Sequence, residues 1–186
     1  MNLPNKLTIL RIVLSFVFMF FIFSQGMLFK ILALAVFTIA SITDFLDGYI
    51  ARKYNLITEL GKLLDPIADK ILVLTAFLAF VYFQIIPAWM LIIIIFREVL
   101  ITASRLILAK KGKVIPASVW GKYKTISQMI AIFIILGFIV LKEYGLSNAL
   151  VINLTSLVNI VMYITIGLTL GSGISYFLKN KNAFKN

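Results

Sequence analysis

The chain has 186 residues, a length that favours one domain covering residues 1–186. It is 62% hydrophobic and 13% charged, with a mean hydropathy of +1.06, whereas soluble domains are about half apolar and a quarter charged. This composition excludes an ordinary soluble enzyme, a disordered chain and a DNA-binding module. Cysteine and histidine are absent from the sequence, so disulfides, thiolate nucleophiles, imidazole bases and zinc sites made from these residues are excluded.

Several apolar stretches approach the roughly 20 residues that a helix needs to cross a bilayer. They predict an all-α integral membrane protein with six transmembrane helices, at residues 7–23, 31–50, 63–83, 88–109, 126–141 and 150–178. Asn5, Thr8 and Arg11 recur at intervals of three near the start. A short interfacial helix ahead of the first span therefore stays open as an alternative.

The basic residues indicate how these spans are oriented. Among the 18 Lys and Arg, only Lys30 and Lys142 lie near the connections on one side, and the other 16 lie on the side of both termini or in the helices that lead to it. Because cytoplasmic loops of membrane proteins are rich in Lys and Arg, both termini are predicted to be cytoplasmic. The net charge of +11 is then a topology signal, and no nucleic-acid partner is expected.

All four aspartates of the chain fall in one short stretch, at the predicted cytoplasmic ends of the second and third spans. Their spacings of three and four residues place each pair on one helix face. Four carboxylates that converge between antiparallel helices need positive charge, and an all-oxygen site suits Mg²⁺, Mn²⁺ or Ca²⁺. The alternative is that these side chains only cap helices. The aspartates are Asp44, Asp47, Asp65 and Asp69.

These residues belong to a longer pattern, which reads Asp44-x2-Asp47-Gly48-x2-Ala51-Arg52-x8-Gly61-x3-Asp65-x3-Asp69. It resembles the complete signature of the CDP-alcohol phosphatidyltransferase family, without a departure at any of its eight fixed positions. The resemblance implies a six-span membrane enzyme, generally homodimeric. Such an enzyme moves the phosphatidyl group of CDP-diacylglycerol to an alcohol and releases CMP.

The resemblance also implies a role for each residue of the signature. Asp69 is the expected general base, and the expected ligands of a divalent metal, Mg²⁺ or Mn²⁺ with two ions, are Asp44, Asp47, Asp65 and Asp69. The residues expected to bind the nucleotide of the CDP-lipid are Asn5, Thr8, Gly48, Ala51, Arg52 and Gly61.

Flanking stretches point to one acceptor alcohol. The opening residues 2–8, the pair Arg97-Glu98 and the segment 121–125 resemble bacterial family members that use glycerol 3-phosphate. The acceptor's phosphate needs cations, for which Arg105, Lys122 and Lys124 are the candidates. Glu98 lies seven residues before Arg105 and is expected to pair with it. The expected location is a bacterial plasma membrane, with the active site on the cytoplasmic side.

Two alternatives remain at this point. The first keeps the family and changes the acceptor to inositol phosphate, serine or phosphatidylglycerol. The second is an ion-coupled membrane transporter with an acidic site, which predicts ion flux and no release of CMP.

Overall fold

The chain folds into a bundle of helices, and no strand occurs among the residues that the computed structural model describes. These are residues 3–53, 59–110, 119–145 and 147–181, with their side chains except at 3–6, 45–53, 59–67, 69 and 109–110. The six helices of this part are α1 Leu3–Phe23, α2 Met27–Lys53, α3 Glu59–Tyr82, α4 Ala88–Lys110, α5 Val119–Glu143 and α6 Asn148–Lys179. The prediction of an all-α fold is confirmed.

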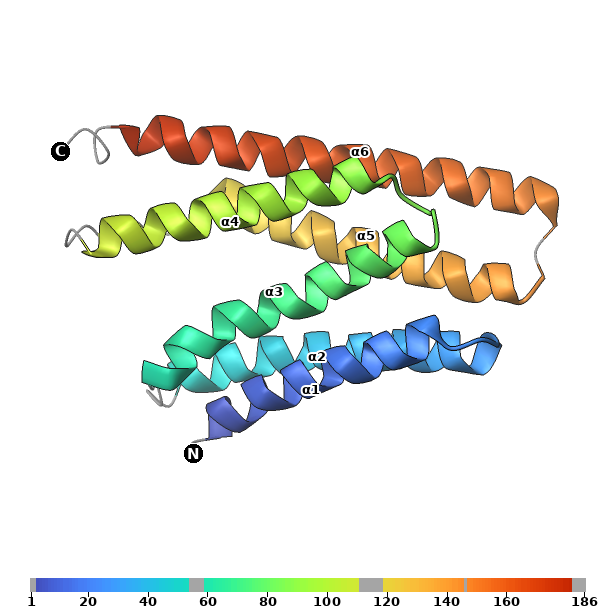
Figure 1. Cartoon of the computed structure of the whole chain (residues 1–186), viewed down its shortest axis with the longest axis horizontal. Helices are drawn as coiled ribbons and strands as arrows, with labels where there is room; N and C mark the ends of the chain where they lie inside the picture. Colours follow the sequence, from blue (N-terminus) through green and yellow to red (C-terminus); the bar gives the residue numbers. More distant parts are fainter. Residues whose placement is uncertain (1–2, 54–58, 111–118, 146, 182–186) are drawn as a thin grey trace.

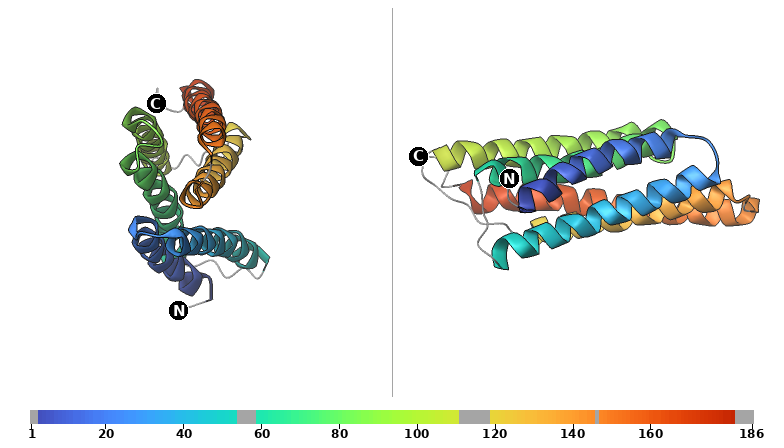
Figure 2. Two further views of the ribbon diagram at one scale, coloured as in Figure 1. Left: turned by 90° about the vertical axis from the view of Figure 1, so that its right-hand side faces the viewer. Right: turned by 90° about the horizontal axis from the view of Figure 1, so that it is seen from below.

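The helices run along the long axis of the molecule, and both termini lie at one end of it (Figure 1). The same end, called the terminal end below, holds the last residues of α2 and α4 and the first residues of α3 and α5. α1 packs against both α2 and α3, whereas α6 packs against α4 and α5. The end-on view separates these two groups of helices (Figure 2).

Two glycines make tight turns at the opposite end. Gly26, just before α2, has φ = 99°, and Gly145, just after α5, has φ = 91°. Side chains with a Cβ atom rarely adopt this left-handed conformation. The two glycines therefore allow α1 to reverse into α2, and α5 into α6, through short connections.

The bundle is apolar both inside and outside. Phe18, Phe37, Phe77 and Phe80 are fully buried, and the rings of Phe18 and Phe37 lie 5.6 Å apart. Large apolar side chains such as Phe20 are at the same time exposed on the outer faces. Among the described residues, three stretches are long and apolar enough to cross a membrane: Met27–Asp44, Val119–Glu143 and Asn148–Lys179.

Several helices extend beyond the boundaries predicted from the sequence, and the extensions of α1 and α5 have consequences for the site. α1 runs unbroken from Leu3 to Phe23, so a separate N-terminal interfacial helix is not formed. α5 begins at Val119, although its apolar run was predicted to begin at Ile126. The lysines in its first turns lower the local hydropathy, yet Lys124 is buried inside the bundle, where its charge has a partner.

Candidate functional site

The aspartates of the signature lie on two helices that meet the terminal end. Asp44 and Asp47 belong to the last part of α2, and Asp65 and Asp69 to the first half of α3. α2 and α3 run in opposite directions, so the aspartate-bearing segments come to the same end of the bundle (Figure 1). The backbone there is helical, as the spacing requires.

Of the four aspartates, only the side chain of Asp44 lies within the described residues. Those of Asp47, Asp65 and Asp69 lie outside them. The predicted positions of Asn5, Gly48, Ala51, Arg52 and Gly61 have helical backbone, but their side chains are likewise outside the described part.

Asp44 forms an ion pair with Arg11 of α1. The Arg11 side chain is 1% exposed and the Asp44 side chain 45% exposed, so a buried cation holds a carboxylate that is still open to solvent. Thr8 and Ser15, on the same side of α1, are also buried. The polar stripe of α1 therefore faces α2 and α3, and its Arg11 neutralises the first aspartate of the signature.

A second polar cluster centres on Glu98 in the middle of α4. The Glu98 carboxylate contacts the ammonium of Lys124 on α5 and lies 3.1 Å from a guanidinium nitrogen of Arg97. Arg97 also donates to the hydroxyl of Ser172 on α6, at 3.2 Å. Lys70 of α3 is close enough to act on Glu98 electrostatically. Glu98 thus joins charged groups from three helices inside the bundle.

The prediction that Glu98 pairs with Arg105 is wrong. Seven residues span about 10 Å along a helix axis, which is too far for direct contact between these side chains. The guanidinium of Arg105 instead lies over the ring of Tyr176, 5.7 Å from its centroid. Neighbouring residues point in different directions on a helix, but the long side chain of Arg97 still reaches the Glu98 carboxylate.

The candidates for the acceptor's phosphate lie at the terminal end of α4 and α5. Arg105 and Lys122 are exposed, whereas Lys124 is buried against Glu98. Arg105 makes no ion pair among the described residues. The structure therefore gives these basic residues two different environments, one open and one enclosed.

Two residues that take part in these polar clusters, Arg11 and Lys70, were not identified from the sequence. Arg11 was noted only as one of three polar residues at intervals of three, although a charge within an apolar stretch normally has a buried partner. Lys70 follows Asp69 directly and donates to the hydroxyl of Thr102 on α4. It links the helix of the last signature aspartate to the Glu98 cluster, and its position beside Asp69 was the available signal.

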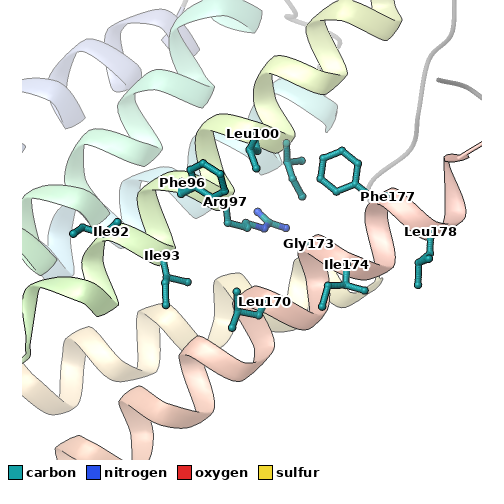
Figure 3. A pocket seen from close by; sticks show the side chains of 11 residues that line it. Ile92, Ile93, Phe96, Arg97, Leu100, Leu170, Gly173, Ile174, Phe177 and Leu178 are labelled. Atoms are coloured by element: carbon teal, nitrogen blue, oxygen red, sulfur yellow. The ribbon is translucent and has the colours of Figure 1, made fainter. Parts of the chain in front are cut away.

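A groove between α4 and α6 differs from these polar clusters. It encloses about 460 Å³, and its walls are apolar apart from Arg97. Figure 3 shows the Arg97 side chain crossing toward Gly173, where a Cβ atom would lie 3.6 Å from the Arg97 stem. The groove therefore offers little polar surface to a charged ligand.

Residues 1–171 match the family described as CDP-alcohol phosphatidyltransferase. The match covers all six helices, with only the end of α6 beyond it, and it includes the whole aspartate signature. The chain belongs to the CDP-alcohol phosphatidyltransferase family.

Curated relatives resemble the chain over nearly its full length. A CDP-diacylglycerol–glycerol-3-phosphate 3-phosphatidyltransferase of Bacillus subtilis is 42% identical, with 99% of this chain and 97% of the relative covered. The enzyme of the same name from Rickettsia bellii is 40% identical, over 98% of this chain and 97% of its own length. A probable phosphatidylglycerophosphate synthase of Mycobacterium tuberculosis is 38% identical, over 94% of this chain and 79% of its own length.

Proposed function

We propose that this protein transfers the phosphatidyl group of CDP-diacylglycerol to glycerol 3-phosphate, giving phosphatidylglycerophosphate and CMP. The observation that carries the proposal is the complete aspartate signature on α2 and α3 at one end of the bundle. The choice of glycerol 3-phosphate is supported by relatives named for that acceptor, at 42% and 40% identity over almost the whole chain.

The proposed reaction is a direct displacement. A hydroxyl oxygen of glycerol 3-phosphate bonds to the lipid-side phosphorus of CDP-diacylglycerol, the bond from that phosphorus to the bridging oxygen breaks, and CMP leaves with the electron pair. Asp69 takes the proton of the attacking hydroxyl. Because histidine is absent, a carboxylate is the most suitable base in the chain for this step. No covalent intermediate on the enzyme is required.

The side chains proposed to hold the metal are Asp44, Asp47, Asp65 and Asp69. Their donor set is entirely oxygen, which fits Mg²⁺ or Mn²⁺, and four carboxylates suit two ions. Bound ions of this kind supply positive charge beside the pyrophosphate oxygens and the departing CMP. Arg11 fits the arrangement because its ion pair leaves the Asp44 carboxylate partly open to solvent.

The substrates are proposed to bind on either side of these aspartates. The residues assigned to the nucleotide of the CDP-lipid are Asn5, Thr8, Gly48, Ala51, Arg52 and Gly61, of which Thr8 is buried in the helix interface. Arg105, Lys122 and Lys124 are assigned to the acceptor's phosphate. The guanidinium of Arg105 is well shaped for that role, because its planar fork matches phosphate oxygens.

The proposed setting is a bacterial plasma membrane crossed by all six helices, with both termini and the active site on the cytoplasmic side. The common location of the termini and the aspartate segments at one end of the bundle supports this topology. Lys30 in the first turn of α2 and Lys142 in the last turn of α5 are the described basic residues nearest the opposite end. A homodimer is proposed from the family resemblance.

Release of CMP tests the proposed function directly. Purified protein in detergent is given CDP-diacylglycerol and Mg²⁺ with glycerol 3-phosphate, inositol phosphate, serine, phosphatidylglycerol or no acceptor. We expect CMP only with glycerol 3-phosphate, and none after addition of a chelator. Release with another acceptor would change the substrate and keep the family. If the protein neither binds the CDP-lipid nor releases CMP, the enzyme proposal fails and ion flux should be measured.

Arg105→Ala tests the proposed acceptor site. We expect the KM for glycerol 3-phosphate to rise by roughly 10- to 100-fold, the range for loss of a hydrogen bond to a charged group. The KM for CDP-diacylglycerol should stay unchanged. Steady-state kinetics check this, with Lys142→Ala at the opposite end of the bundle as the matched loss of a cation. An unchanged KM for the acceptor would remove Arg105 from the site.

A further inference from the structure

A stripe of hydroxyl groups runs along the inner face of α6. Thr165, Thr169, Ser172 and Tyr176 are all buried, and their spacing of four, three and four residues places them on one side of the helix. The stripe is unusual because the rest of α6 is largely apolar. It faces α4 and α5, against which α6 packs.

Three of these hydroxyls have hydrogen-bond partners within the protein. Thr165 donates to the carbonyl of Val161 at 2.9 Å, Thr169 to that of Thr165 at 2.7 Å and Ser172 to that of Thr169 at 2.8 Å. The hydroxyl of Tyr176 is different. It is buried, and it has no hydrogen-bond partner among the described residues.

A buried hydroxyl without a partner destabilises the folded protein, so its presence calls for a reason. Packing does not supply one, because a phenylalanine ring would fill the same space without the polar atom. A ligand supplies one, since the phenol can donate a hydrogen bond to an oxygen atom that arrives only with the substrate. An anionic oxygen is the strongest acceptor for such a bond.

The surroundings of Tyr176 indicate which substrate this is. The guanidinium of Arg105 lies 5.7 Å from the centre of the Tyr176 ring. One helical turn away, Ser172 accepts a hydrogen bond from Arg97, which contacts Glu98, the partner of Lys124. Tyr176 therefore lies beside Arg105, one of the cations assigned to the acceptor's phosphate, and one helical turn from the α6 residue that contacts Arg97.

We propose that the hydroxyl of Tyr176 donates a hydrogen bond to the phosphate of the acceptor, which makes Tyr176 a substrate-binding residue beside Arg105. This inference rests on the proposed function, because it takes glycerol 3-phosphate as the acceptor. It adds a neutral donor from α6 to cations from α4 and α5, so that all three helices hold the same anion.

Tyr176→Phe tests the inference with minimal change to packing. We expect the KM for glycerol 3-phosphate to rise about tenfold or more, as for loss of one hydrogen bond to a charged group. The KM for CDP-diacylglycerol should stay unchanged. The thermal stability should not fall, because the hydroxyl has no internal partner to lose. Tyr163→Phe is the matched control, since Tyr163 is 60% exposed on the same helix, and it should leave both KM values unchanged.

Calorimetric titration with glycerol 3-phosphate separates this inference from the proposed function. If the natural protein binds glycerol 3-phosphate but releases no CMP, the proposed activity is wrong, and weaker binding by Tyr176→Phe still supports the contact. If the natural protein is active and Tyr176→Phe has an unchanged acceptor KM, the inference is overturned. A marked loss of stability in Tyr176→Phe overturns it too, because the hydroxyl would then have an internal partner. Absence of both binding and turnover with glycerol 3-phosphate overturns both proposals.

Discussion

Replacement of Asp69 by asparagine is expected to reduce CMP release by at least about 10²- to 10⁴-fold, the usual contribution of a positioned general base. Asparagine keeps the size of the side chain and its oxygen donor, but it cannot take the proton of the attacking hydroxyl. Most nucleotide binding should therefore remain. Single-turnover measurement of CMP release, together with titration of the CDP-lipid, separates these two properties.

Three further substitutions distinguish loss of the base from loss of the metal. Asp44→Asn and Asp65→Asn are expected to lose metal-dependent binding of the CDP-lipid as well as turnover, because both carboxylates are proposed metal ligands. Glu59→Gln is the control, since Glu59 begins α3 outside the signature. Turnover near that of the natural protein in Asp69→Asn would show that another group is the base.

The sequence was sufficient to predict the helices and to predict at which end of the bundle the proposed active site lies. Each of the six apolar stretches corresponds to a helix, because a chain in lipid satisfies its backbone hydrogen bonds within each segment. The excess of basic residues on the side of both termini agrees with the single end at which these segments meet (Figure 1). Neither inference needs knowledge of how the helices pack.

Side-chain partners were harder to predict, because they depend on which helices are neighbours. The sequence indicated that α2 and α3 are adjacent, yet in the described part of the chain α1 packs against both helices more extensively than they pack against each other. For this reason the partner of Asp44 comes from α1, as Arg11. The partner of Glu98 likewise comes from α5, as Lys124, and not from its own helix.

Hydropathy also placed the start of α5 too late in the sequence. The segment Gly121-Lys122-Tyr123-Lys124-Thr125 is polar enough to resemble a loop, although it forms the first turns of a helix. Lys124 can enter the bundle because the carboxylate of Glu98 meets it there. A hydropathy scale assigns each residue its own free energy of transfer into lipid, so it cannot account for a charge that is paired within the protein.

Glu98→Gln is expected to lower the free energy of unfolding by about 3–5 kcal/mol, the usual cost of removing one partner of a buried ion pair. The Glu98 side chain is 14% exposed, and its partners Lys124 and Arg97 are 6% and 12% exposed. Without the carboxylate, Lys124 and Arg97 both lose the contact with Glu98 while their charges stay largely enclosed. Thermal or denaturant unfolding in detergent measures the loss. Glu143→Gln, at the exposed end of α5, should change stability little.

The double substitution Glu98→Leu with Lys124→Met separates the structural role of this pair from its chemical role. Apolar residues of similar size often replace a buried ion pair with little loss of stability, so the part of the loss in Glu98→Gln that comes from Lys124 should return. The part that comes from Arg97 should remain, because Arg97 still lacks the Glu98 carboxylate. The double variant should bind the acceptor more weakly than the natural protein, because Lys124 is one of the cations proposed for the phosphate. A stable double variant with a natural KM for glycerol 3-phosphate would show that Lys124 serves only to neutralise Glu98, and would leave Arg105, Lys122 and Tyr176 to bind the phosphate.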